Sequence, residues 1–147
     1  MFVRIVVGTD GSDTAKEAVR QATDLAKKVG AKLDVMSAFA PVSGARLREE
    51  RKDAPADVEH QISPSEDVEA TLAEAAEEVS AAGVEVETFS RQGDPADAIL
   101  ELAEENDADL IVVGNKGMTG AKRFLLGSVP NKVSHHAPCS VLIVRTT

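Results

Sequence analysis

Leu110-Ile111-Val112-Val113-Gly114-Asn115-Lys116-Gly117 is followed, after nine residues, by Gly127-Ser128-Val129. The apolar run at the start predicts a buried parallel strand, bounded by a glycine turn. Glycines after a strand let a ligand approach the backbone closely. Gly127 and Ser128 are typical of a helix start, whose first N–H groups lack internal partners and carry partial positive charge. The segment therefore predicts an anion site, most simply for a polyphosphate, unless these glycines only turn the chain.

Outward from this segment, short apolar runs alternate with helical patterns along the whole chain. Strands are expected at 3–8, 32–38, 84–90, 110–113 and 140–144, and helices at 13–29, from 64 to Gly83, from 95 onward and at 128–136. This alternation predicts an α/β fold: one domain, residues 1–147, with a doubly wound, Rossmann-like, five-stranded parallel sheet and helices on both faces. Such sheets bind ligands beyond the carboxyl ends of their strands, where the winding reverses.

The helix boundaries carry recognisable signals. Ser12 and Asp94 are expected as N-caps, and Gly30 is expected to end the first helix. The run Ser63-Pro64-Ser65-Glu66 is a capping box with proline at the first helical position. Residues 41–62 mix charges, prolines and small residues, which is typical of a long surface loop or a partial helix, and no role is assigned to them.

Charge is distributed unevenly along the chain. The net charge is −9, which argues against nucleic acid and anionic membrane as partners. Residues 110–147 nevertheless hold no Asp or Glu and five basic residues, four of them in or beside the glycine-rich segment: Lys116, Lys122, Arg123 and Lys132. This asymmetry favours an anion site there, with chance as the alternative. One cysteine, no signal peptide and no membrane-length apolar run indicate a cytoplasmic setting.

Common nucleotide-binding and hydrolase motifs do not occur in this sequence. The turn after the first strand reads Gly8-Thr9-Asp10-Gly11-Ser12, without the dinucleotide fingerprint, and there is no Walker loop or nucleophile elbow. Together with the Gly114-x2-Gly117-x9-Gly127-Ser128 spacing, this turn resembles the universal stress protein family, from about Phe2 to Arg145, with 41–62 as the weak part. In that family the G-x2-G-x9-G-[S/T] pattern marks the members that bind ATP.

The resemblance implies a strand order of 3-2-1-4-5 and an ATP site across the carboxyl ends of strands one and four. The turn with Gly8 and Thr9 would belong to this site, and Asp10 would contact the sugar or the nucleotide. The backbone near Ala38 would hydrogen-bond the adenine. From the residues alone, the alternative for Asp10 is a hydrogen bond to its own turn, and the ribose suits a carboxylate better than a phosphate does unless a Mg²⁺ lies between them.

The resemblance places the phosphates on the glycine-rich segment, with Mg or Mn bound to them. Gly114, Asn115 and Gly117 would border the ribose and phosphates, and Gly127, Ser128 and Val129 would hold the phosphates. Lys116 either adds positive charge or points to solvent.

Pro130 departs from the hydroxyl residue that many members of the family have at this position. Proline removes a backbone donor, so the N–H groups of residues 128, 129 and 131 are expected to remain for the phosphates. The loss should weaken the site and not abolish it.

The sequence thus predicts a cytoplasmic, ATP-binding stress-response regulator with little or no turnover. The resemblance also implies a homodimer paired through the last strand, Val141, Leu142, Ile143 and Val144. One alternative is an enzyme, a slow ATP hydrolase or an adenylyl-transferring relative of the ATP pyrophosphatases. No general base is evident near the phosphate segment, so Asp10 alone could orient a water. The other alternative is a nucleotide-free dimeric scaffold.

Adjacent His135 and His136 point about 100° apart on a helix, which argues against a metal site.

Overall fold

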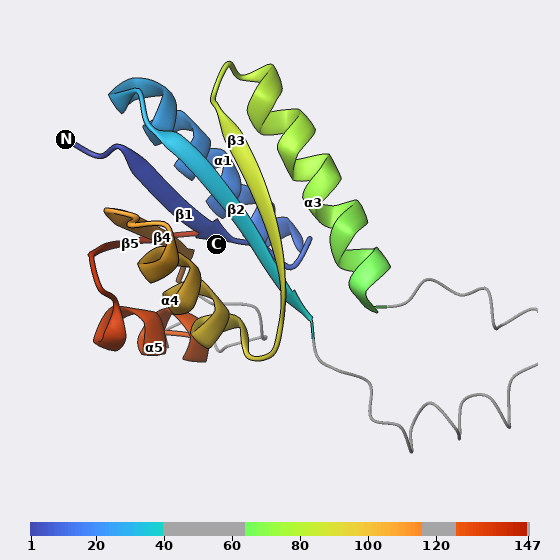
Figure 1. Cartoon of the computed structure of the whole chain (residues 1–147), viewed down its shortest axis with the longest axis vertical. Coiled ribbons are helices and arrows are strands. Elements are labelled where there is room, and N and C mark those ends of the chain that lie inside the picture. Colours follow the sequence, from blue (N-terminus) through green and yellow to red (C-terminus); the bar gives the residue numbers. More distant parts are fainter. Residues whose placement is uncertain (40–63, 116–125, 147) are drawn as a thin grey trace, which may run out of the picture.

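Five parallel strands form one sheet in the order β3-β2-β1-β4-β5 (Figure 1). The computed structural model describes residues 1–39, 64–115 and 126–146. The strands are β1 (Arg4–Gly8), β2 (Lys32–Phe39), β3 (Val86–Gln92), β4 (Leu110–Gly114) and β5 (Ser140–Val144). The predicted doubly wound α/β fold and its strand order are confirmed. Because winding reverses between β1 and β4, the ligand position expected from the sequence lies beyond the carboxyl ends of these two strands.

The helices cover both faces of the sheet, as Figure 1 shows. On one face α1 (Asp13–Val29) and α3 (Pro64–Ala81) pack against strand side chains such as Ile5 and Val7. On the other face α4 (Pro95–Glu105) and α5 (Ser128–His136) pack against the alternate set, such as Val6 and Ile111. These side chains are fully buried, so the strands read as continuous apolar runs. Among the described helices, none has the length and apolar composition that crossing a bilayer requires.

The predicted helix boundaries agree with the structure. The Ser12 hydroxyl accepts a hydrogen bond from the Ala15 N–H at 3.2 Å, and the Asp94 carboxylate accepts one from the Asp97 N–H at 3.1 Å. Gly30 ends α1 in the left-handed conformation, with φ of 74°. Helix α3 begins at Pro64, as expected, while Ser63 of the capping box lies outside the described residues.

Strand β3 is shifted by two residues from its predicted position at 84–90. Val84 is still tied to the end of α3, through the hydrogen bond from its N–H to the Val79 carbonyl. At the other end, Arg91 and Gln92 continue the pairing with β2, opposite Ala38 and Phe39. The strand therefore starts and ends later than its apolar pattern indicated. The predicted surface loop at 41–62 lies outside the described residues.

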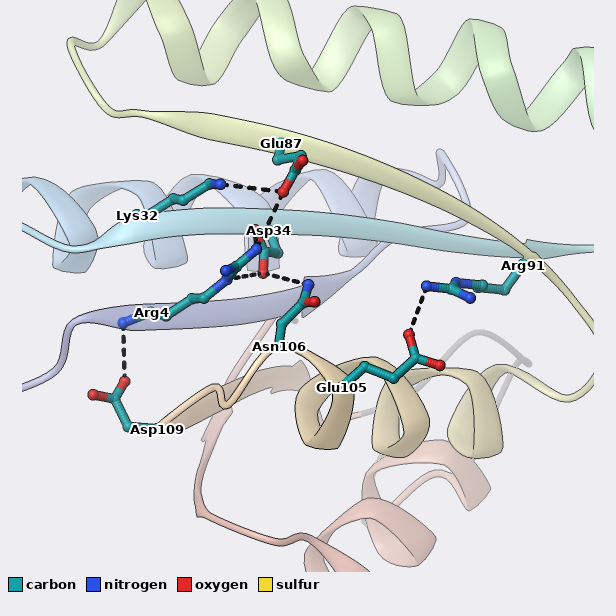
Figure 2. A network of polar contacts seen from close by, with 8 residues as sticks. All are labelled: Arg4, Lys32, Asp34, Glu87, Arg91, Glu105, Asn106 and Asp109. Atoms are coloured by element: carbon teal, nitrogen blue, oxygen red, sulfur yellow. Dashed lines mark hydrogen bonds and ion pairs between the residues drawn. The ribbon is translucent and has the colours of Figure 1, made fainter.

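A polar network joins the amino ends of the strands (Figure 2). The Asp34 side chain on β2 is fully buried and accepts hydrogen bonds from the Arg4 guanidinium, at 2.6 Å from Nε and 3.3 Å from Nη2. Asn106, just after α4, donates to the same carboxylate at 3.2 Å. Arg4 also donates to Glu87, which binds Lys32 as well. The hydrogen bond to Asp34 raises the pKa of the Arg4 guanidinium above its usual value.

At the same edge of the sheet, Asp109 in the loop before β4 binds the start of β1. The two carboxylate oxygens of Asp109 accept the backbone N–H groups of Val3 and Arg4, at 2.8 and 3.1 Å. In return, the Asp109 N–H donates to the Arg4 carbonyl at 3.0 Å. The start of β1 is therefore held by side chains from β2 and β3 and by Asp109 in the loop before β4. This anchoring lies at the amino edge of the sheet, opposite the predicted ligand site.

Candidate functional site

The carboxyl ends of β1 and β4 meet at a shallow cleft between the two helix layers. Three of the predicted site residues line it: Gly8, Gly114 and Val129. The rest of its lining comes from both layers and from β4: Thr14, Ala15, Ala18, Ile99 and Val113. The cleft thus brings together the end of β1 with the end of β4 and the start of α5, which lie more than a hundred residues later in the sequence.

The start of α5 offers backbone donors on one side of this cleft. Gly127 is the N-cap, and no side chain caps the helix. Ser128 is exposed at the first helical position, and among the described residues no acceptor binds the N–H of Ser128 or Val129. Two backbone donors and one hydroxyl therefore lie at the positive end of a helix, which suits a phosphate group.

The expectation of three remaining donors around Pro130 is wrong. The Asn131 N–H donates to the Gly127 carbonyl at 3.0 Å, within the first turn of α5. It is therefore not available to a ligand. Pro130 itself is a buried residue of α5, so a packed ring stands where a hydroxyl would have contributed a donor.

Lys132 is paired with carboxylates of the protein, whereas the charge asymmetry suggested that it contributes positive charge for an anion. Its ammonium group lies 2.7 Å from the Asp97 carboxylate and 3.6 Å from Asp94, at the start of α4. The hydrogen bond to Asp97 raises the Lys132 pKa. This lysine therefore forms an exposed ion pair between α5 and α4. Lys116, Lys122, Arg123 and Gly117 lie outside the described residues.

The turn after β1 is held by its own side chains. One carboxylate oxygen of Asp10 accepts the Ser12 N–H at 2.9 Å, which is the local hydrogen bond that the sequence left open as an alternative. Asp10 is exposed and lies two residues after Gly8, which lines the cleft. Thr9 is buried, with its N–H on the Met36 carbonyl and its hydroxyl accepting the Gly11 N–H. Gly11 has φ of 82° and would press a Cβ to 3.1 Å from Thr71 Oγ1, so glycine is required there.

Ala38 lies near the end of β2, on the same sheet edge as the cleft. Gly8 pairs with Met36, so Ala38 extends two residues beyond the end of β1. It is half-buried on the face covered by α4 and α5. Its position next to the turn at Thr9 and Asp10 is compatible with the predicted backbone contact to a base, although Ala38 does not line the cleft itself.

Two residues beside the cleft have roles that the sequence did not indicate. The Asn115 side-chain oxygen accepts hydrogen bonds from the backbone N–H and the hydroxyl of Thr146, at 2.9 and 3.1 Å. A Cβ on Gly114 would lie 3.2 Å from the Thr146 methyl group, so this glycine also makes room for Thr146. Thr146 follows the last strand and belongs to no motif, so only the fold brings it to this place.

Cys139 is half-buried, and burial raises the pKa of its thiol, with the Asp109 charge acting in the same direction. A raised pKa leaves less thiolate at a given pH, and the thiolate is the reactive form. At pH 7.5, Cys139 in the folded protein should therefore react with iodoacetamide more slowly than it does in urea. Mass spectrometry of timed samples measures both rates, and equal rates would contradict this prediction.

Comparison with known proteins shows the family of this chain. The model of the universal stress protein family matches residues 1–145. Universal stress protein Rv1636 of Mycobacterium tuberculosis is 41% identical, with 99% of this chain and 98% of the relative covered. A universal stress protein crystallised with cAMP is 36% identical and superimposes with a TM-score of 0.73, covering 99% and 98% of the two chains.

A second solved complex has a more distant sequence. The universal stress protein from Archaeoglobus fulgidus in complex with dAMP is 26% identical, with a TM-score of 0.67 and 97% of each chain covered. The family match spans nearly the whole chain, and the Mycobacterium tuberculosis relative shares about two residues in five over its full length. The chain therefore belongs to the universal stress protein family.

Proposed function

We propose that this protein binds an adenine nucleotide in the cleft between β1 and β4, with a phosphate group at the start of α5. The observation that carries the proposal is that Gly8, Gly114 and Val129 line one cleft, beside the backbone donors at the start of α5. Glycine at the strand ends lets the ligand approach the backbone, and the helix start favours its negative charge. The complexes of two relatives with cAMP and dAMP support an adenine ligand.

The proposed physiological ligand is ATP with Mg or Mn. Two backbone N–H groups and the Ser128 hydroxyl suffice for about one phosphate group. The remaining phosphates need another source of positive charge, which a divalent ion supplies. Among the described residues no group of three or more His, Cys, Asp or Glu side chains could hold a metal ion, so the phosphates and water would supply most of its ligands.

Replacing Ser128 by aspartate should test the phosphate position directly. A carboxylate at the first position of α5 is favourable for the helix, so the fold should be retained. It would repel a phosphate bound at the same place, and we expect AMP and ATP affinity to fall by about tenfold or more while adenosine affinity stays unchanged. Isothermal titration calorimetry with the three ligands measures these affinities.

Two matched variants control this experiment. Ser128→Ala removes the hydroxyl alone and should cost far less than Ser128→Asp, because both backbone donors remain. Lys132→Gln removes a positive charge from the same helix, yet that charge is engaged by Asp97, so AMP affinity should change by less than about twofold. If Ser128→Asp binds AMP as the unmodified protein does, the phosphate does not lie at the start of α5.

Removal of the divalent ion should affect ATP and AMP differently. With EDTA in the buffer, ATP should bind about tenfold more weakly, because its outer phosphates lose their neutralising charge. AMP affinity should be nearly unchanged, since one phosphate is served by α5. Calorimetric titration with and without MgCl₂ checks this, and equal losses for both nucleotides would contradict the proposed division between helix and ion.

We further propose that the protein is a cytoplasmic, homodimeric stress-response regulator with little or no turnover. The sequence from 110 to 147 holds no carboxylate that could activate a water beside the phosphates. Incubation with labelled ATP tests this, and turnover near 1 s⁻¹, in the ordinary range of enzymes, would favour the ATP hydrolase instead. The edge strand β5 exposes Leu142 and Ile143, which supports pairing with a second copy.

A further inference from the structure

Asn115, directly after β4, is hydrogen-bonded to the end of β5 and to the N-cap of α5. Its N–H donates to the Val144 carbonyl at the end of β5, at 2.9 Å. Its own carbonyl accepts the N–H of Gly127, the N-cap of α5, at 3.0 Å. Through its backbone alone, Asn115 therefore connects the end of β5 to the start of the proposed phosphate-binding helix.

The Asn115 side chain adds a third connection, to the residues after β5. Its oxygen accepts both the N–H and the hydroxyl of Thr146. A carbonyl oxygen has two lone pairs, so these two bonds use its full capacity as an acceptor. A ribose hydroxyl therefore cannot donate to this oxygen without displacing Thr146. In the Asn115 side chain, the amide N–H groups remain as donors for a contact with the ligand.

The segment that carries Thr146 is itself fixed on the neighbouring helix. The Gln21 side chain of α1 donates to the Arg145 carbonyl at 3.3 Å. The Thr146 methyl group occupies the space in front of Gly114, where a Cβ would come within 3.2 Å. The position of Thr146 is thus restrained in two ways. Helix α1 binds the preceding residue, Arg145, and Thr146 itself contacts Gly114 and Asn115.

We propose that Thr146 and Asn115 are positioning residues that set the start of α5 for the phosphate of the ligand, through the hydrogen bonds that join Thr146, Asn115 and Gly127. The inference rests on the proposed nucleotide site and adds a residue outside the glycine motif to it. If Asn115 shifts, the hydrogen bond to Gly127 is lost, and the donors of Ser128 and Val129 move with Gly127. Only the phosphate part of the ligand depends on these donors.

The first test needs no ligand. Amide hydrogen exchange followed by NMR reports the Gly127 N–H, which is bonded to the Asn115 carbonyl. Thr146→Val keeps the shape of the side chain and removes one donor, and Asn115→Leu has a similar size and removes the acceptor. Each should speed exchange of the Gly127 amide by about fivefold, the effect of one ordinary hydrogen bond. The Gly93 amide, bonded to the Phe39 carbonyl at a distant turn, is the internal control and should not change.

The second test uses AMP and adenosine as probes in calorimetric titrations. Both variants should lose AMP affinity about fivefold while adenosine affinity stays the same. Asn115→Asp keeps an acceptor for Thr146, so it should restore slow exchange of the Gly127 amide, which a general loss of stability would not do. Unchanged exchange in both Asn115→Leu and Thr146→Val, or equal losses for AMP and adenosine, would overturn the proposal.

The two proposals can fail separately. If the unmodified protein binds neither adenosine nor AMP, the proposed function is wrong. The exchange measurement still shows in that case whether Thr146 and Asn115 set the start of α5. If the unmodified protein binds AMP and the variants bind it equally well, the nucleotide site stands and the positioning role is refuted.

Discussion

Arg4→Met should lower the free energy of unfolding by about 3–5 kcal/mol, because it leaves the buried Asp34 carboxylate without its cationic partner. The methionine keeps the apolar stem but donates no hydrogen bond. Among the described residues, Asn106 then remains as the side-chain donor to Asp34, at 3.2 Å. One neutral hydrogen bond does not offset the burial of a charge. Urea unfolding followed by circular dichroism measures the change, since the chain has no Trp or Tyr to report it.

Arg20 provides a matched control for this variant. Its guanidinium also contacts two carboxylates, Glu17 and Asp24, but all three groups lie on the exposed face of α1. Arg20→Met should therefore leave unfolding almost unchanged. The double variant Arg4→Met with Asp34→Leu removes both charges and should recover much of the lost stability. If Arg4→Met costs no more than Arg20→Met, Asp34 is not held as a buried charge by Arg4.

Leu142→Lys combined with Ile143→Lys should convert the proposed dimer into a monomer. These neighbours on β5 point to opposite faces of the sheet and are 41% and 38% exposed, although they are large and apolar. Within the described residues, β5 is an edge strand, so its outer backbone groups are open to pairing with another chain. Two lysines place like charges across a symmetric interface and bury them on association. Sedimentation velocity at micromolar concentration measures the change.

Val3→Lys is the control for this pair of substitutions. Val3 is also apolar and 70% exposed, but it lies before β1 at the amino edge, away from β5. It should leave the dimer intact. A monomeric unmodified protein at the same concentration, or a double variant that remains dimeric, would show that β5 is not the interface. Circular dichroism confirms in parallel that the variants stay folded.

The sequence was sufficient for the fold because local and global signals agree. The apolar run at 110–113 is too short for a helix and too continuous for a half-exposed strand, so it specifies a buried parallel strand. The caps at Ser12 and Asp94 use side chains three residues away from their partners, which a sequence displays directly. The start of β3 was misplaced because the register with β2, and not the apolar pattern, decides which residues pair.

The polar partners could not be predicted in the same way. Arg4 and Asp34 are thirty residues apart, and Asn115 and Thr146 are thirty-one apart, so nothing local connects them. A lysine near a glycine-rich segment suggests a ligand contact, whereas the carboxylates that engage Lys132 come from another helix. The positions of Gly8 and Gly114 were predictable because each follows directly on an apolar run that forms a buried strand. The hydrogen-bond partners of the surrounding side chains were not predictable, because the packing of the whole sheet determines which side chains meet.

The separation of the polar network from the cleft has a consequence for how the family can diversify. The charged anchor of the sheet lies at the amino ends of the strands, and the cleft lies at the carboxyl ends. Substitutions around the cleft therefore leave the hydrogen bonds and ion pairs at the amino ends of the strands unchanged. Ligand preference can drift, be exchanged for another phosphate-bearing molecule or be lost altogether, while the chain still folds and remains available for selection.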